Sequence, residues 1–202
     1  IASSGSNLGK VSSPNGIALD SNNQIYVADT GNDRIQVFDN NGSFIRSFGN
    51  NEIFTEPWGV AVSANGLVFV SDKSQNKVHV FDTAGNLTGS WGESGSLNHQ
   101  LNSPRGIVVG PTGDLFVADY SNFSVKKFSP TGDLQLRIDL TKNGGSSSTN
   151  EGSRPISVGV RQDGMIVTSA RYGRSDTKFW VFDNLGNKLH EYKYYKSNER
   201  KE

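Results

Sequence analysis

One segment recurs four times along the chain, and this recurrence constrains the fold more than any other feature of the sequence. Each copy opens with a Pro followed by small and apolar residues. The openings lie at residues 14–20, 57–63, 104–110 and 155–160. The landmark residues keep the same spacing within each copy, whereas the segments that join the copies vary in length, as surface loops can. Each copy is therefore expected to be one structural unit.

Three further landmarks keep fixed offsets within the copies. Fifteen residues after the Pro, an apolar segment ends at Asp29, Asp72, Asp119 and Ala170. An aromatic residue follows after nine residues, or after twelve in the fourth copy, at Phe38, Phe81, Phe128 and Phe182. A Gly lies four residues beyond each aromatic, at Gly42, Gly85, Gly132 and Gly186. Offsets kept in four copies indicate a repeat protein.

Each copy carries signals for four short strands. In the first copy, segment 17–19 is a run of small and apolar residues, which predicts a strand buried on both faces. Segment 25–28 is a second strand, 34–38 alternates polar and apolar residues, and 44–48 is a more polar fourth strand. Asn- and Gly-containing turns separate them. Four antiparallel strands in about 45 residues are typical of a β-propeller blade.

The first copy resembles the NHL repeat most clearly, in residues 14–20, 26–38 and 48–49. The second and third copies match well, and the fourth departs at Ala170 and over 171–178. The resemblance covers residues 14 to about 192. It implies an all-β β-propeller, in that family usually of six blades, with the first strand of each blade lining a central channel.

We expect a single propeller domain, or part of one, over residues 1–202. Its blades are predicted at about 14–50, 57–92, 104–140 and 155–195, after a partial blade at 1–13. Residues 1–5 align with 45–49, so the chain is expected to open inside the outer strand of an earlier blade. A fragment of a six-bladed propeller is the favoured interpretation, and a ring closed by 1–5 or shared by two chains is the alternative. Segment 142–150 is predicted to be a flexible connection.

Composition excludes several classes of function. Twenty basic and 20 acidic residues cancel, which argues against a nucleic-acid binder that works by overall charge. The chain contains no Cys, so disulfides and thiolate chemistry are excluded. The longest apolar runs fall short of the roughly 18 residues of a membrane-spanning helix. A local binding patch and Cys-free catalysis remain open.

The recurrent residues are expected to be scaffold. An Asp that returns in three copies is best interpreted as a carboxylate that caps a turn by accepting backbone N–H groups, because an active-site group would be needed only once. The recurrent aromatics are predicted to pack between blades. The recurrent Gly residues suit turns and close backbone approach.

The residues that differ between copies are the candidates for function. Asn15, Trp58, Arg105 and Ile156 follow the Pro of each copy, near one mouth of the expected channel. Tyr120 and Phe123 lie in the turn after Asp119, and the fourth copy carries an insertion that includes Arg171 and Arg174. Trp and Arg are enriched at binding hot spots. We predict a binding rim of Asn15, Trp58, Arg105, Tyr120, Arg171 and Arg174.

The resemblance also suggests two alternatives. Related propellers include metal-dependent lactonase-like enzymes, which use Asn, Asp and Glu at the channel mouth, and a peptide-amidating lyase that uses His; the likeness here amounts to Asn15. His79, His99 and His190 are not expected to converge on a metal. Other NHL propellers bind single-stranded RNA on a basic face, and segment 171–174 is the best candidate here. Residues 151–202 hold ten basic and seven acidic residues, only a slight excess.

From these observations the sequence predicts a non-catalytic interaction or ligand-sensing scaffold, with no catalytic residue, metal site or cofactor. The expected partner is a protein, bound through loops at one mouth of the channel. Self-association, or further blades that complete the ring, is a second expected form of partnership.

Overall fold

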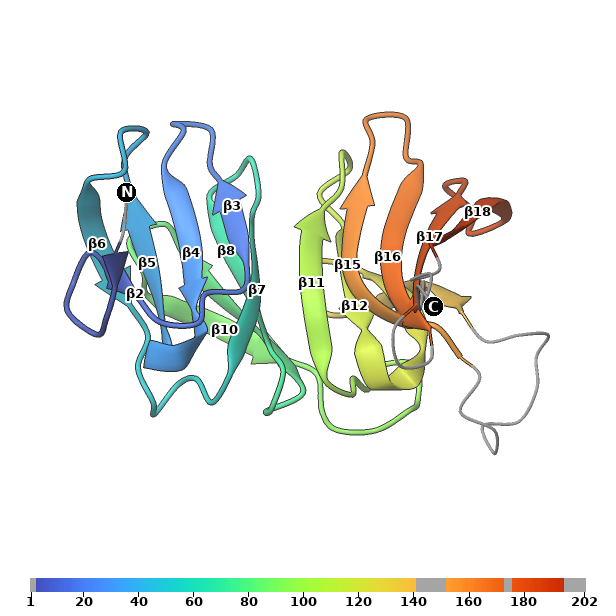
Figure 1. Ribbon diagram of the computed structural model, residues 1–202, viewed down its shortest axis with the longest axis horizontal. Coiled ribbons are helices and arrows are strands. Elements are labelled where there is room, and N and C mark those ends of the chain that lie inside the picture. Colours follow the sequence, from blue (N-terminus) through green and yellow to red (C-terminus); the bar gives the residue numbers. More distant parts are fainter. Residues whose placement is uncertain (1–2, 141–151, 173–175, 195–202) are drawn as a thin grey trace, which may run out of the picture.

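A computed structural model describes residues 3–140, 152–172 and 176–194. Apart from two 3-10 turns, η1 (Thr30–Asn32) and η2 (Tyr120–Asn122), its regular elements are all strands. Most of them form four antiparallel four-stranded sheets, and the strand order in each sheet follows the chain (Figure 1).

Each sheet corresponds to one sequence copy. The first blade contains β3 (Ile17–Leu19), β4 (Ile25–Asp29), β5 (Arg34–Phe38) and β6 (Phe44–Phe48). The second contains β7 (Pro57–Val62), β8 (Leu67–Asp72), β9 (Lys77–Asp82) and β10 (Leu87–Trp91). The third contains β11 (Pro104–Val109), β12 (Leu115–Asp119), β13 (Ser124–Phe128) and β14 (Leu134–Asp139). The fourth contains β15 (Arg154–Val160), β16 (Ile166–Tyr172), β17 (Asp176–Phe182) and β18 (Lys188–Tyr194).

The four blades are arranged as in a β-propeller, which confirms the predicted fold. The first strand of each blade is innermost: β3 packs beside β7, β7 beside β11 and β11 beside β15 (Figure 1). Three apolar clusters fill the spaces between successive blades. No helix in the described part of the chain is long and apolar enough to cross a membrane.

Recurrent aromatics pack between blades, as predicted. Phe81 receives the ring of Phe48 from the preceding blade at a centroid distance of 5.0 Å, and Phe128 receives Trp91 at 4.8 Å. Phe182 belongs to the cluster between the third and fourth blades. Phe38 instead contacts Phe44 of its own blade, at 6.2 Å. The same position therefore serves as an inter-blade socket in the last three blades.

A Gly near the start of the inner strand lets neighbouring blades approach closely. A Cβ built on Gly59 would lie 2.5 Å from the carbonyl oxygen of Arg105, and one on Gly106 would lie 2.7 Å from the Cα of Ser157. Backbone atoms cannot move aside cheaply, so these positions need Gly. In the fourth blade, the equivalent residue is Ser157 itself, which is exposed.

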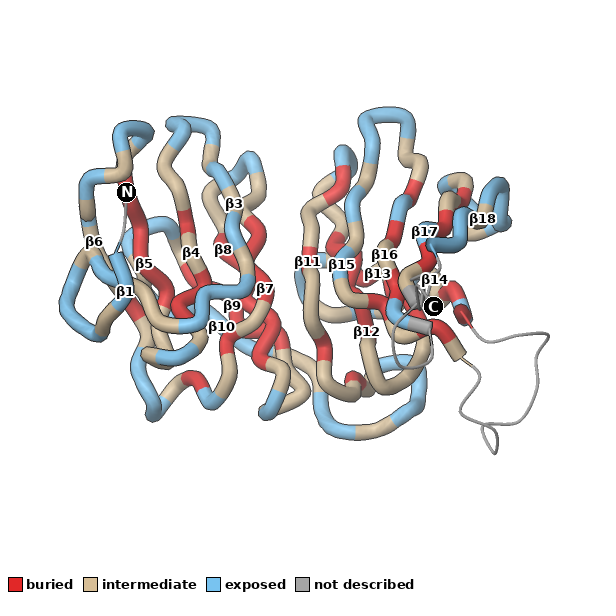
Figure 2. Tube along the Cα trace, in the orientation of Figure 1, coloured by how far each residue is buried: buried red, intermediate tan, exposed pale blue. Residues whose placement is uncertain are grey.

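The two outermost faces of this arc are open (Figure 2). Ile17 and Leu19 of β3 are 70% and 59% exposed, so the predicted burial of segment 17–19 on both faces is wrong. Its physical reason is that no described blade precedes β3. On the fourth blade, Phe179 and Tyr192 are exposed where the corresponding residues of earlier blades pack against the next blade.

The start of the chain differs from its predicted alignment. The strand β1 (Ser3–Ser4) pairs in parallel with β2 (Lys10–Val11), in a two-stranded sheet of its own. The Gly5 N–H donates to Val11 O at 2.9 Å, as the Gly95 N–H donates to Leu101 O at 3.1 Å. Gly5 therefore matches Gly95 of an inter-blade loop rather than Gly49. The predicted flexible connection at 142–150 lies outside the described residues.

Candidate binding rim

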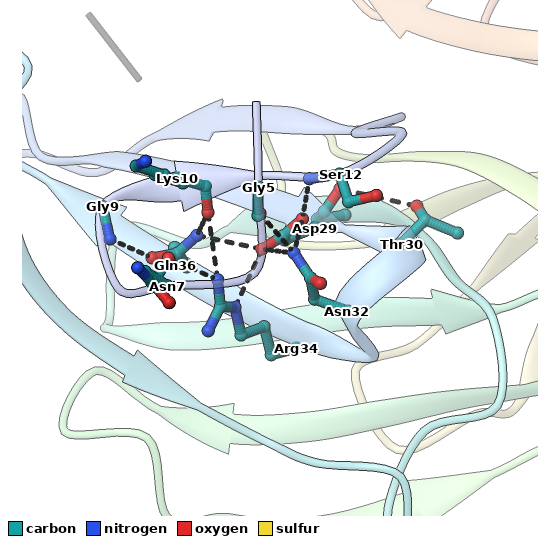
Figure 3. A network of polar contacts seen from close by, with 11 residues as sticks. Gly5, Asn7, Gly9, Lys10, Ser12, Asp29, Thr30, Asn32, Arg34 and Gln36 are labelled. Carbon is teal, nitrogen blue, oxygen red and sulfur yellow. Dashed lines mark hydrogen bonds and ion pairs between the residues drawn. The ribbon is translucent and has the colours of Figure 1, made fainter. Parts of the chain in front are cut away.

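Asp29, at the end of β4, is a buried structural carboxylate (Figure 3). It accepts a hydrogen bond from the Ser12 N–H at 2.6 Å, which ties the loop before the blade to the second strand. Arg34 Nε and Gln36 Nε2 donate to its other oxygen at 2.8 and 2.9 Å. Both oxygens of the carboxylate therefore accept hydrogen bonds from neighbouring residues of the chain.

The two equivalent carboxylates do the same work. Asp72 accepts the Thr55 N–H at 2.7 Å, and Asp119 accepts the Asn102 N–H at 2.7 Å. All three Asp side chains are fully buried. Capping of the inter-blade loop, rather than catalysis, explains why this residue recurs, and the prediction of a capping carboxylate is confirmed.

The buried residue beside the recurrent Asp position differs from blade to blade. The position two residues before the recurrent aromatic holds Gln36, His79, Lys126 and Trp180. Gln36 and Lys126 contact the Asp of their blades, whereas the ring nitrogens of His79 have no hydrogen-bond partner in the described structure. Lys126 Nζ lies 2.9 Å from Asp119 Oδ2, and both side chains are fully buried. Burial raises the pKa of Asp119 and lowers the pKa of Lys126, while the attraction between their charges opposes both shifts. The fourth blade carries Ala170 and Trp180, so carboxylate and partner are lost together.

Three positions in each blade lie at the end of the propeller where the inner strands begin. They are the residue before the Pro, the residue after it and the residue after the recurrent Asp, whose place is taken by Ala170 in the fourth blade. Together they form what we call the rim: Ser13, Asn15, Thr30, Glu56, Trp58, Lys73, Ser103, Arg105, Tyr120, Arg154, Ile156 and Arg171. Among these residues only Ser returns at the same position, before the Pro of the first and third blades.

A series of cation–π contacts joins three blades across the rim. The guanidinium of Arg105 lies 4.6 Å from the ring centroid of Trp58 and 3.5 Å from that of Tyr120. Lys73 covers Trp58 at 4.9 Å. Arg154 lies 5.3 Å from the centroid of Tyr120. Such contacts stabilise by about 0.5–2 kcal/mol each, more where the cation is desolvated, and hold long side chains in place.

The unpaired positive charge of the rim gathers in the third and fourth blades, because Lys73 of the second blade is paired with Glu56. Burial lowers the pKa of Arg105, and the positive charges of Arg171 and Arg154 lower it further, against the influence of Tyr120 and Glu56. Burial would raise the pKa of Glu56, but hydrogen bonds from Lys73 and Ser74 hold it below its usual value. The basic end of the rim therefore belongs to the third and fourth blades.

The predicted rim residues do not all meet. Trp58, Arg105 and Tyr120 form one contact group, whereas Asn15 donates to Ser13 O at 3.2 Å and to Thr30 Oγ1 at 2.8 Å within its own blade. Arg171 is exposed at the end of β16, in register with Arg154. Arg174 lies outside the described residues, so its predicted role stays a prediction.

Sequence reasoning missed Glu56, Lys73 and Arg154. Glu56 and Arg154 precede the Pro of their copies, so extending the repeat by one residue upstream would have found them. Lys73 follows Asp72 in the second copy, as Tyr120 follows Asp119 in the third. Their contacts across blades could not have been foreseen from strand periodicity.

The three His residues lie apart. His79 is buried in β9 beside the ring of Phe54, at a centroid distance of 5.3 Å. His99 contacts Glu93 at 3.0 Å in an exposed loop, and His190 lies on β18 beside Tyr192. Within residues 3–140, 152–172 and 176–194, no three His, Asp or Glu side chains gather as metal ligands would.

The blades, their inner strands and the capping carboxylates define a β-propeller of four-stranded blades. The family model of the NHL repeat matches residues 12–38, 54–81 and 101–128, which are the first three copies. The chain therefore contains three NHL repeats. None of the curated proteins searched matches it.

Solved structures share the fold at low sequence identity. Hydrazine synthase from Kuenenia stuttgartiensis matches with a TM-score of 0.70 and 14% identity, over 91% of this chain and 50% of that chain. Virginiamycin B lyase from Staphylococcus aureus matches with a TM-score of 0.64 and 14% identity, over 91% and 55% of the two chains. A gluconolactonase from Xanthomonas campestris gives 0.62 and 18%, over 87% and 60%. These likenesses show the fold alone, and the chain spans about half the length of the first two.

Proposed function

We propose that this chain is a non-catalytic interaction scaffold that binds a protein partner through the rim. The observation that carries the proposal is the contact group of Trp58, Arg105 and Tyr120, which the inner strands β7 and β11 and the turn η2 bring together. The recurrent Asp residues cap the inter-blade loops, and three of the four recurrent aromatics pack between blades. The rim combines residues that differ between copies with partial exposure and mutual contact.

The composition of this group suits a protein interface. Trp, Tyr and Arg dominate binding hot spots because they offer large contact areas with few rotatable bonds to immobilise. Trp58, Arg105 and Tyr120 are each partly exposed and held by one another, so little side-chain entropy would be lost on binding. The rim is thus preorganised for a partner.

The open faces of the first and fourth blades support a second kind of contact, with another blade. Phe48 and Trp91 fill sockets at Phe81 and Phe128 of the next blade. Tyr192 holds the equivalent place on the fourth blade and is exposed. Another propeller blade, in a second copy or in a longer chain, would cover it.

The rim is tested by capture of partners from a native lysate. The double variant Trp58→Ala/Arg105→Ala should lose a partner that wild type retains. A matched control, Asn65→Ala/Arg161→Ala, alters exposed turns at the opposite end of the inner strands and should retain it. Unchanged capture by the rim variant would contradict the proposal. The competing enzyme function predicts a bound divalent metal near Asn15, which elemental analysis of purified protein would detect.

A further inference from the structure

We infer that the basic end of the rim binds an acidic peptide segment, with Arg105 and Arg154 receiving its carboxylates. This inference rests on the proposed function and names the chemistry of the partner. Three observations support it: both guanidinium groups lie over aromatic rings, neither has a carboxylate partner among the described residues, and a further arginine lies nearby.

Aromatic rings fix both guanidinium groups from the side. The guanidinium of Arg105 lies over the rings of both Trp58 and Tyr120, with centroid distances of 4.6 and 3.5 Å. Arg154 lies 5.3 Å from the centroid of Tyr120 and 5.1 Å from that of Phe123. An arginine stacked in this way keeps its N–H edges available for a planar, bidentate acceptor such as a carboxylate.

Neither arginine has a carboxylate partner among the described residues. The nearby Glu56 is already engaged, by Lys73 Nζ at 2.5 Å and by Ser74 Oγ at 2.6 Å. Arg105 Nε is buried and has no hydrogen-bond partner within the described structure. A buried unpaired donor costs free energy, and an incoming acceptor would remove that cost.

The positive charges of neighbouring arginines also favour binding of an anion. Arg105, Arg154 and Arg171 lie near enough for the charges of the other two to lower the pKa of Arg105. Repulsion among partly desolvated cations disfavours the unliganded rim. A chain of carboxylates would offset this repulsion at several cations at once.

The same geometry disfavours single-stranded nucleic acid. Base binding of that kind relies on free aromatic faces for stacking. Here Arg105 stands over Trp58 and Tyr120, Lys73 also covers Trp58, and Arg154 covers Phe123. These rings already hold cations of the chain itself, and the N–H groups of the arginines suit carboxylates on a peptide.

Fluorescence anisotropy with a fluorescein-labelled decaglutamate peptide tests this inference. Wild type should bind the peptide at low salt and should not bind labelled decaglutamine. Arg105→Gln and Arg154→Gln should each weaken binding by about tenfold or more, because a charge-assisted hydrogen bond contributes about 1.5–3 kcal/mol. Arg161→Gln, at the opposite end of the inner strands, should leave affinity unchanged.

Arg105→Lys guards against a folding defect in the first variant. It keeps the charge and loses the planar fork, so it should bind decaglutamate more weakly than wild type but more tightly than Arg105→Gln. Absence of decaglutamate binding, equal affinity of all variants, or tighter binding of labelled (dT)10 than of decaglutamate would overturn the inference. If decaglutamate fails while Trp58→Ala/Arg105→Ala still abolishes partner capture, only the acidic chemistry is wrong and the proposed function stands.

Discussion

Removing the carboxylate of Asp119 should destabilise the protein severely, and this loss can be worked out from its surroundings. In Asp119→Ala the Asn102 N–H, the Asn122 side chain and Lys126 lose an acceptor at 2.7, 2.7 and 2.9 Å. Asp119 and Lys126 are both fully buried, so water cannot replace what is lost. Lys126 keeps only the carbonyl oxygens of Leu97 and Gln100.

The stranded ammonium sets the scale of the effect. Breaking a buried pair from one side costs about 3–5 kcal/mol. Lys126 can escape by losing its proton, and at pH 7 this would cost at most about 4.6 kcal/mol for a lysine with a reference pKa near 10.4. Burial already lowers the pKa of Lys126, so the cost stays below that ceiling. We expect a loss of about 3–5 kcal/mol, a large fraction of the roughly 5–15 kcal/mol by which a typical domain is stable.

Urea unfolding at pH 7, followed by tryptophan fluorescence and circular dichroism, measures this loss. The matched control is Lys126→Gln, since Gln36 occupies the same position in the first blade and donates to Asp29 at 2.9 Å. It should lose less than Asp119→Ala, because the Gln amide still donates to the carboxylate although the cation is removed. If the unfolding free energy of Asp119→Ala lay within about 0.5 kcal/mol of the wild-type value, the structural assignment of this carboxylate would be refuted. Such a difference is far smaller than the cost of breaking a buried pair.

Three further predictions address packing, titration and association. Gly59→Ala should lower the unfolding free energy by about 1–3 kcal/mol, because its Cβ would lie 2.5 Å from the Arg105 carbonyl oxygen. Gly89→Ala, where nothing lies within 4 Å of the new Cβ, should not lower it. Equal urea midpoints for the two variants would contradict this. Burial lowers the pKa of His79, so below about pH 6.5 the unfolded chain binds more protons than the folded one and stability should fall. His79→Gln should flatten this dependence of unfolding free energy on pH. Parallel curves for the variant and wild type would refute the prediction. Phe179→Lys/Tyr192→Lys should reduce self-association in sedimentation velocity, and an unchanged distribution would exclude this face.

Much of the fold could be predicted because its determinants are local and repeated. The four strands predicted in the first copy lie within one residue of the observed bounds of β3, β4, β5 and β6. The recurrence of Asp29 and Asp72 was enough to assign them to the scaffold. These features depend on alternation and turn residues, which a single copy already contains.

What could not be predicted depends on neighbours distant in sequence. Ile17 belongs to a sequence typical of a buried strand, yet its exposure is decided by whether another blade lies against it. The partnership of Arg154 with Tyr120 crosses two blades and follows from the angle between them. Gly5 was misplaced because the pairing of β1 with β2 is set by Val11, not by a copy of the outer strand.

Site-specific photo-crosslinking tests the central claim most directly. A benzoylphenylalanine placed at Trp58, on the rim, is compared with one placed at Asn65, in the turn at the other end of the same blade. We predict that irradiation in native lysate links a discrete protein to position 58, and that excess decaglutamate suppresses this product. A product of equal yield at position 65, or none at position 58, would contradict the assignment of the rim as the binding surface.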